Sequence, residues 1–180
     1  LNPQVHPPMG GCDFTVILKG EGINPVGLPR PVICFWPDAF GRLPEEEKLL
    51  RFHDRVYTSV PDGLDGRFFF PLGFDPDMHR DLGRQRRQLS MFFGTATERK
   101  VRYLQVMRPD AVFGNGWGEG VQPQYGWDLV RTLNEYALAI NVHREEMGVT
   151  RRLFEMLACC PTITDDVPGV RRVLGEAADG

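Results

Sequence analysis

The residues best suited to chemistry lie between positions 139 and 166, where two short apolar runs flank an arginine-rich stretch. The first run predicts a strand that ends at Val142, which places His143 and Arg144 at its carboxyl end. Ligands of open α/β sheets bind at the carboxyl ends of the strands. A helix that starts nearby offers free backbone N–H groups to a phosphate.

The helix predicted next, over residues 149–159, brings further charged side chains to the same place. Arg151, Arg152 and Glu155 fall in its first two turns. An arginine can bind a diphosphate through its planar fork, and a glutamate can accept hydrogen bonds from ribose hydroxyls. Together with the strand predicted at 161–164, these residues indicate a nucleotide site.

Each of these side chains also has an ordinary structural interpretation. Glu155 could be a surface acid at the edge of a core helix, and His143 a hydrogen-bonded histidine at a strand end. Arg151 is expected to face solvent. His53 and His79 have the appearance of surface or linker residues.

The first half of the chain alternates apolar and amphipathic runs, which is typical of an α/β fold with a parallel sheet. Its predicted strands cover residues 13–19, 31–36, 55–60 and 67–72, with a helix over 44–53. Only residues 61–66 join the last two strands, whereas a parallel crossover needs about ten or more. Either these strands form an antiparallel hairpin or residues are missing from the chain there, and we favour the second interpretation.

Residues 75–88 break the alternation with Pro, Gly and several arginines, which predicts a linker. We interpret Arg84, Arg86 and Arg87 as part of a solvated connector in preference to a phosphate-binding patch. The alternation then restarts. Strands are predicted over 90–94, 111–114, 139–142 and 161–164, and helices over 97–107, 128–136, 149–159 and 169–177.

The composition places limits on the class of protein. With 180 residues, a net charge of −3 and 42% hydrophobic residues, the chain is typical of a soluble globular protein. It is not a disordered tail, a collagen or a strongly basic nucleic-acid module. No apolar run approaches the roughly 20 residues of a membrane helix. The four cysteines fit neither a disulfide framework nor a metal site, so we expect reduced thiols in a cytoplasmic protein.

Several motifs of the second half occur in a fixed order. The pattern N-x-x-R, R-x-F-E-x-x-A and T-D is matched by Asn141, Arg144, Arg152, Phe154, Glu155, Ala158, Thr164 and Asp165. Gly94 followed by Arg99, and the Gly-rich segment that carries Trp117, precede it. With these motifs the sequence resembles the CgeB-like (spore maturation protein-like) glycosyltransferases of the GT-B superfamily.

The resemblance implies an α/β fold of GT-B type, with two Rossmann-like domains facing across a cleft. We expect residues 1–82 to form an incomplete acceptor-side domain and residues 83–180 the domain that binds the nucleotide-sugar. The donor-binding residues that it implies are Gly94, Arg99, Trp117, Asn141, His143, Arg144, Arg152 and Glu155. Arg99 and Arg152 would face the diphosphate, and Glu155 the ribose. Asp38, after the strand at 31–36, is the candidate catalytic base, although helix capping is the favoured interpretation of it.

The resemblance further implies a hexosyltransferase-like enzyme that uses no metal and no cofactor, with a UDP-sugar as the favoured donor. The acceptor hydroxyl could belong to a small molecule, a protein, a glycan or a modified DNA base. Whether the protein forms a homodimer is left open.

Two departures from the family pattern leave other functions open. Cys160 stands where the family usually has Gly, and Met147 where many retaining relatives have a second glutamate. The alternatives are a non-catalytic nucleotide-binding or scaffold protein on the same fold, and a single flavodoxin-like domain. Because the chain opens with Leu1 and stops at Gly180 within a predicted helix, we expect it to be part of a longer protein.

Overall fold

The computed structural model describes residues 13–18, 26–36, 51–58, 67–70, 73–144 and 148–175. Asp38, Met147, the link over 61–66 and most of the helix predicted at 44–53 lie outside these residues. The chain divides into two compact units. The first comprises Leu1–Pro71 and Pro168–Gly180, and the second comprises Leu72–Val167.

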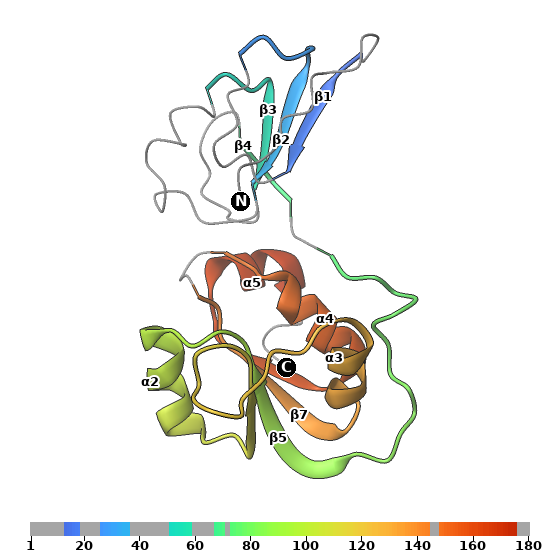
Figure 1. Cartoon of the computed structure of the whole chain (residues 1–180), viewed down its shortest axis with the longest axis vertical. Helices are drawn as coiled ribbons and strands as arrows, with labels where there is room; N and C mark the ends of the chain where they lie inside the picture. Colours follow the sequence, from blue (N-terminus) through green and yellow to red (C-terminus); the bar gives the residue numbers. More distant parts are fainter. Residues whose placement is uncertain are drawn as a thin grey trace. The chain divides into compact units, whose positions relative to one another are not determined.

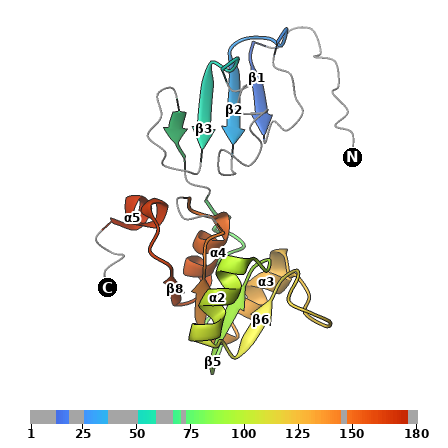
Figure 2. The same ribbon diagram turned by 90° about the vertical axis from the view of Figure 1, so that its left-hand side faces the viewer.

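The first unit contains a four-stranded parallel sheet in the order β1-β2-β3-β4, whose strands lie side by side in Figure 2. Its strands are β1 (Thr15–Leu18), β2 (Val32–Trp36), β3 (Arg55–Thr58) and β4 (Arg67–Phe69). The buried side chains of this sheet are Ile17, Val32, Cys34, Trp36 and Val56. Because β3 and β4 pair in parallel, the antiparallel hairpin is wrong. Helix α5 (Pro168–Leu174) groups with this unit.

The second unit alternates strands and helices around another parallel sheet, in the order β6-β5-β7-β8. Figure 1 labels β5 and β7 of this sheet. Its strands are β5 (Arg87–Phe93), β6 (Ala111–Phe113), β7 (Tyr136–Asn141) and β8 (Thr162–Thr164). Its helices are α2 (Glu98–Met107), α3 (Gly126–Leu133) and α4 (Arg151–Cys159). The predicted α/β class with parallel sheets is therefore confirmed.

Helices cover both faces of this second sheet because consecutive side chains of a strand point to opposite faces. Met91 and Phe93 of β5 pack with α3 and α4 in one buried cluster, which includes Met156. Phe92 lies between them in sequence and packs with Leu104 of α2 in another cluster. Figure 1 shows α2 on one side of the sheet and α3 and α4 on the other.

The segment predicted as a solvated connector is partly buried in the second unit. Arg86 donates hydrogen bonds to the carbonyls of Leu133, Tyr136 and Cys159, at 2.7–3.2 Å. Two of these carbonyls are at the carboxyl ends of α3 and α4, where carbonyls lack partners within the helix. The interpretation of Arg86 as solvated is therefore wrong. A local charge pattern cannot show that a guanidinium fits the carbonyls at two helix ends.

The limits of some elements differ from the predictions by a few residues. Helix α3 ends at Leu133, and Tyr136, predicted as helical, begins β7. Strand β5 begins at Arg87, three residues before the predicted start at 90. Cys160 follows α4 in an extended conformation with φ −158°, so the missing glycine is accommodated without a left-handed cap. Among the described residues, no helix is long and apolar enough to cross a bilayer.

Candidate functional site at the edge of the second sheet

A cavity of about 250 Å³ opens at the carboxyl edge of β5, β6 and β7. Strand β5 has β6 on one side and β7 on the other. The chain therefore adds β6 on one side of β5 and then crosses to the other side to add β7 and β8. Such a switch point is the place where open α/β sheets bind ligands. The cavity is lined by Phe93, Gly94, Thr95, Lys100, Gly114, Asn115, Pro123, Gln124, Tyr125, Asn141, Val142, Thr150 and Arg152.

Two glycines allow β5 and β6 to approach closely at this edge. Gly114 has φ +125°, and a Cβ atom placed there would lie 2.1 Å from the carbonyl oxygen of Gly94. That oxygen also accepts a hydrogen bond of 2.6 Å from the indole Nε1 of Trp117. Trp117 packs edge to face against Phe92, with ring centroids 5.4 Å apart. The indole of Trp117 thus supports the floor of the cavity from the α2 side of the sheet.

We expect Gly114→Ala to destabilise the protein strongly, because it adds a backbone clash to an unfavourable φ. Gly118→Ala is the matched control, since Gly118 has φ +118° but no atom within 4 Å of an added Cβ. The control should lower the free energy of unfolding by about 1–2 kcal/mol, from backbone strain alone. Gly114→Ala should lower it by at least about 2 kcal/mol more. Urea unfolding of both variants measures the difference, and equal losses would contradict the close packing of the two strand ends.

Two cationic side chains face the cavity from different helices. Lys100 lies in the first turn of α2, which Thr97 caps by accepting a hydrogen bond from the Lys100 backbone N–H. Its Nζ lies 5.9 Å from the centre of the Phe92 ring. Arg152 stacks over Phe93, with 4.8 Å between its Cζ and the ring centre. No carboxylate side chain is among the residues that line this cavity, and a cavity with two cations is suited to an anionic ligand.

The N-terminus of α4 adds backbone donors to the same cavity. Thr150 lies at the N-cap position, and its side chain makes no capping hydrogen bond in the described structure. The first N–H groups of a helix lack partners within the helix and carry a partial positive charge. Thr150 and Arg152 both line the cavity, so this helix end faces any ligand there.

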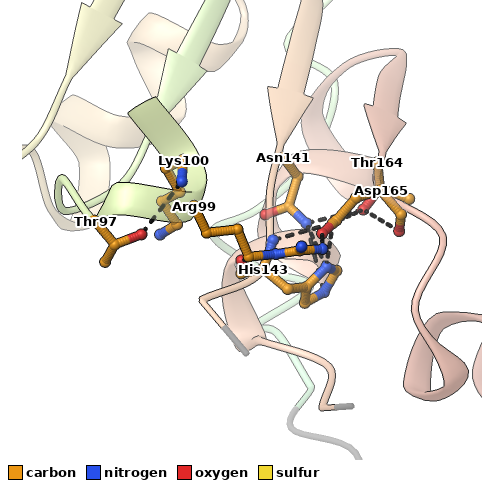
Figure 3. A network of polar contacts seen from close by, with 7 residues as sticks. All are labelled: Thr97, Arg99, Lys100, Asn141, His143, Thr164 and Asp165. Carbon is orange, nitrogen blue, oxygen red and sulfur yellow. Dashed lines mark hydrogen bonds and ion pairs between the residues drawn. The ribbon is translucent and has the colours of Figure 1, made fainter. Parts of the chain in front are cut away.

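A buried network connects α2 to the ends of β7 and β8 (Figure 3). The Asp165 carboxylate accepts hydrogen bonds from His143 Nδ1 at 2.6 Å and from the His143 backbone N–H at 3.0 Å. Arg99 Nη2 donates to the same carboxylate at 2.7 Å. Burial alone would raise the pKa of Asp165, but the His143 and Arg99 hydrogen bonds outweigh it and hold this pKa below its ordinary value.

This network determines what two of the expected donor-binding residues contact. Arg99 pairs with Asp165 and lies over the Tyr103 ring at 4.9 Å. His143 is 1% exposed and uses Nδ1–H toward Asp165, which agrees with the interpretation as a hydrogen-bonded histidine. Asn141 lines the cavity and donates to Thr164 Oγ1 at 3.0 Å, which joins β7 to β8.

Glu155 lies beneath the cationic end of α4 and is 3% exposed. Its carboxylate accepts a hydrogen bond from Arg151 Nε at 2.6 Å. Arg152 Nη1 lies 3.0 Å from the other carboxylate oxygen, as an ion pair without hydrogen-bond alignment. Arg151 is 64% exposed along its side chain, as expected, yet it holds the acid in place.

His79, expected at the surface or in a linker, is 4% exposed, and that interpretation is wrong. Its Nε2 lies 3.7 Å from Glu155 Oε1. Its Nδ1 lies 3.1 Å from the carbonyl oxygen of Asp75, which can only accept, so Nδ1 carries the hydrogen. The segment before β5 folds back over α4, and this long-range contact leaves no local sequence pattern.

The structure thus brings some of the expected donor-binding residues together and separates others. Gly94, Asn141 and Arg152 line the cavity. Arg144 is exposed, and its charge acts on Lys100. Sequence reasoning missed Lys100 itself. One feature of the sequence could have indicated Lys100 as a site residue: it directly follows Arg99, in the first turn of the helix predicted after Gly94.

Comparison with known sequences gives one family. The model of the family described as glycosyl transferase-like matches residues 84–179, more than half of the chain. No curated protein and no solved structure matches.

Proposed function

The chain belongs to the glycosyl transferase-like family, and from this membership we propose that it transfers a sugar from a nucleoside-diphosphate-sugar to a hydroxyl group of an acceptor. The observation that carries the proposal is the cavity at the switch point of the second sheet. Lys100, Arg152 and the N-terminus of α4 converge there. This combination suits the diphosphate that all such donors share.

The same groups have a role in the transfer step. The bond between the anomeric carbon and the diphosphate oxygen breaks, and a bond to the acceptor oxygen forms, while the acceptor proton passes to a base. Negative charge grows on the leaving diphosphate, and fixed cations aimed at it stabilise the transition state. We propose that Lys100 and Arg152 supply this charge without a divalent metal. Asp38 remains the candidate base.

The finer assignment follows the resemblance to CgeB-like enzymes of GT-B type. We propose a UDP-sugar as donor, with Glu155 accepting from the ribose hydroxyls. Since Arg151 and Arg152 already orient that carboxylate, it is pre-organised for such contacts. The acceptor-side domain predicted at residues 1–82 would present the acceptor hydroxyl.

Lys100 gives the proposal a pH signature. Burial lowers the pKa of Lys100, and Arg144 lowers it further, against the opposing effect of Asp165. The charged form binds the diphosphate, so UDP affinity should fall as the pH rises through this lowered pKa, before an ordinary lysine would deprotonate. Lys100→Gln should weaken UDP binding about tenfold and remove this alkaline decrease. Calorimetric titrations across the alkaline range test both effects. An unchanged pH profile in the variant would argue against Lys100 as a ligand of the diphosphate.

The experiment that tests the activity is the detection of its two products. The protein is incubated with UDP-sugars and GDP-sugars, with and without a panel of hydroxyl acceptors, and released nucleoside diphosphate and glycosylated acceptor are measured. The proposal predicts that the wild-type protein releases nucleoside diphosphate and that Arg152→Ala suppresses this release. Nucleotide binding without release or transfer would favour the alternative, a non-catalytic nucleotide-binding or scaffold protein. Met147, in place of the second glutamate of many retaining relatives, and Cys160, in place of the usual glycine, motivate this alternative.

A further inference from the structure

The ammonium group of Lys100 lies against the end of β5, where it helps to line the cavity. A Cβ atom placed on Gly94 would lie 3.0 Å from Lys100 Nζ. A lysine carries a strongly hydrated charge on a flexible stem, so it takes such a position only where its surroundings favour it. The residues that fix the direction and the charge of Lys100 therefore matter for any anion in this cavity.

Arg99, the residue before Lys100, is fixed at two points by groups at the ends of β7 and β8. Its Nη2 donates to the Asp165 carboxylate at 2.7 Å, and its Nε donates to the carbonyl oxygen of His143 at 3.3 Å. Figure 3 shows the Arg99 side chain extending from α2 toward Asp165. Successive residues are about 100° apart around a helix axis. Once Arg99 is bonded to Asp165, the rotation of α2 is set, and Lys100 points away from Arg99 toward β5.

Asp165 is placed to hold this arrangement because β7 and α2 both bond to it. Its carboxylate accepts from the His143 backbone N–H at 3.0 Å, and its own N–H donates to the Asn141 carbonyl oxygen at 3.3 Å. Asn141 lines the cavity. Arg99 and Asp165 line neither this first cavity nor a second one of about 450 Å³ beside Phe74. Asp165 thus connects two walls of the first cavity from behind.

The charges around Lys100 give Asp165 a second effect on this lysine. Charged groups near Lys100 come from several elements: Arg99 on α2 itself, Arg144 after β7, Arg152 on α4 and Asp165 after β8. Burial lowers the pKa of Lys100, and the charges of Arg144 and Arg152 lower it further. Asp165 acts in the opposite direction, because a nearby negative charge favours the ammonium form.

We propose that Asp165 is a positioning residue of the diphosphate site: it aims Lys100 into the first cavity through Arg99, and its negative charge balances the arginines around that lysine. Asp165 touches no ligand in this arrangement and acts on it through Lys100. Arg99 has the same indirect role, in place of the direct contact with the diphosphate that the family resemblance implies. This inference rests on the proposed function, because it presumes a diphosphate in the first cavity.

Calorimetric titrations with UDP and GDP across the alkaline range test the charge that Asp165 supplies. The contribution of Lys100, about tenfold in affinity, should be lost at a lower pH in Asp165→Asn than in the wild type. In Lys100→Gln, with or without Asp165→Asn, this alkaline decrease should be absent. Asp110→Asn is the matched control and should keep the wild-type profile. Asp110 also accepts two hydrogen bonds, from Ser90, but it precedes β6 at the amino end of that strand.

A double-mutant cycle at neutral pH separates an indirect role of Arg99 from a direct one. Arg99→Gln should weaken nucleotide binding by up to about tenfold, because it releases Lys100 from its position. Arg99→Gln combined with Lys100→Gln should bind no more weakly than Lys100→Gln alone, since residues that act through one another are not additive. A direct contact of Arg99 with the diphosphate would instead add a further loss of about tenfold.

The cycle decides the inference even where Asp165→Asn fails to fold, and thermal unfolding of each variant identifies the folded ones. An alkaline profile of Asp165→Asn that coincides with the wild type would overturn the inference and leave the proposed function standing. Unchanged affinity in Arg99→Gln, or additive losses in the cycle, would do the same. Failure of the wild type to bind either nucleotide would overturn the proposed function itself.

Discussion

Replacing Asp165 with alanine should cost about 3–5 kcal/mol of unfolding free energy, the loss typical of a broken buried ion pair. The carboxylate is 1% exposed along its side chain and serves both Arg99 and His143. Its removal takes away the carboxylate that accepts the hydrogen bonds of Arg99 Nη2 and His143 Nδ1 at the edge of the sheet. The ends of β7 and β8 would then lose the group that joins them to α2.

Chemical denaturation measures this effect, with Asp128→Ala as the matched control. Asp128 is 77% exposed along its side chain and pairs with Arg131 on the surface of α3. Such pairs contribute about 0–1 kcal/mol. A loss for Asp165→Ala no greater than for the control would show that the network does not hold the edge of the sheet together.

The Asp165 network also predicts the direction of acid destabilisation. Because its folded-state pKa lies below the ordinary 3.8, Asp165 stabilises the fold fully above that value. This stabilisation is lost as the pH falls through the lower folded-state pKa. The free energy of unfolding should therefore decrease less steeply with acid in Asp165→Ala than in the wild type.

Replacing Arg152 with alanine should weaken nucleoside diphosphate binding by a factor of about 10–100, the equivalent of about 1.5–3 kcal/mol for a charged hydrogen bond. Arg152 is one of the two cations that line the first cavity, and it retains 24% side-chain exposure there. Burial lowers its pKa, while Glu155 opposes this effect, and an arginine stays protonated at neutral pH in either case.

Calorimetry with UDP checks this prediction against Arg102→Ala. Arg102 lies on α2, is 71% exposed along its side chain and pairs with Glu98. Arg152→Lys should give an intermediate affinity, because it keeps the charge but not the planar fork. Glu155→Ala should weaken binding more than Arg151→Ala does. UDP affinity within twofold of wild type in Arg152→Ala would contradict a diphosphate in the first cavity.

Much of the second unit could be predicted from its sequence because its strands and helices carry strong local patterns. The run that ends at Val142 and the helix after Thr150 were placed within a few residues. Tyr136 was misplaced because a buried aromatic residue suits both the end of a helix and the start of a strand, and its ring packs in the buried cluster with α3 and α4. Hydrophobic periodicity alone does not separate these two cases.

The site could be predicted only where local sequence determines the geometry. Gly94 and Asn141 follow from the strand ends, and Arg152 follows from the helix start. The burial of Arg86 depends on hydrogen bonds to the ends of two distant helices, and the burial of His79 depends on its contact with Glu155 within α4. No local sequence pattern records either contact. Arg99 and Lys100 are adjacent and both basic, and only the position of Asp165 decides which of them pairs internally and which faces the cavity.

The central claim is that a nucleoside diphosphate binds at the carboxyl edge of the second sheet. Its most direct test is a calorimetric titration of the wild-type chain with UDP, GDP and their sugars, alongside Arg152→Ala. We expect saturable binding of at least one of these nucleotides, strongly weakened in the variant. Absence of binding to all of them, or binding that Arg152→Ala leaves unchanged, would contradict the claim.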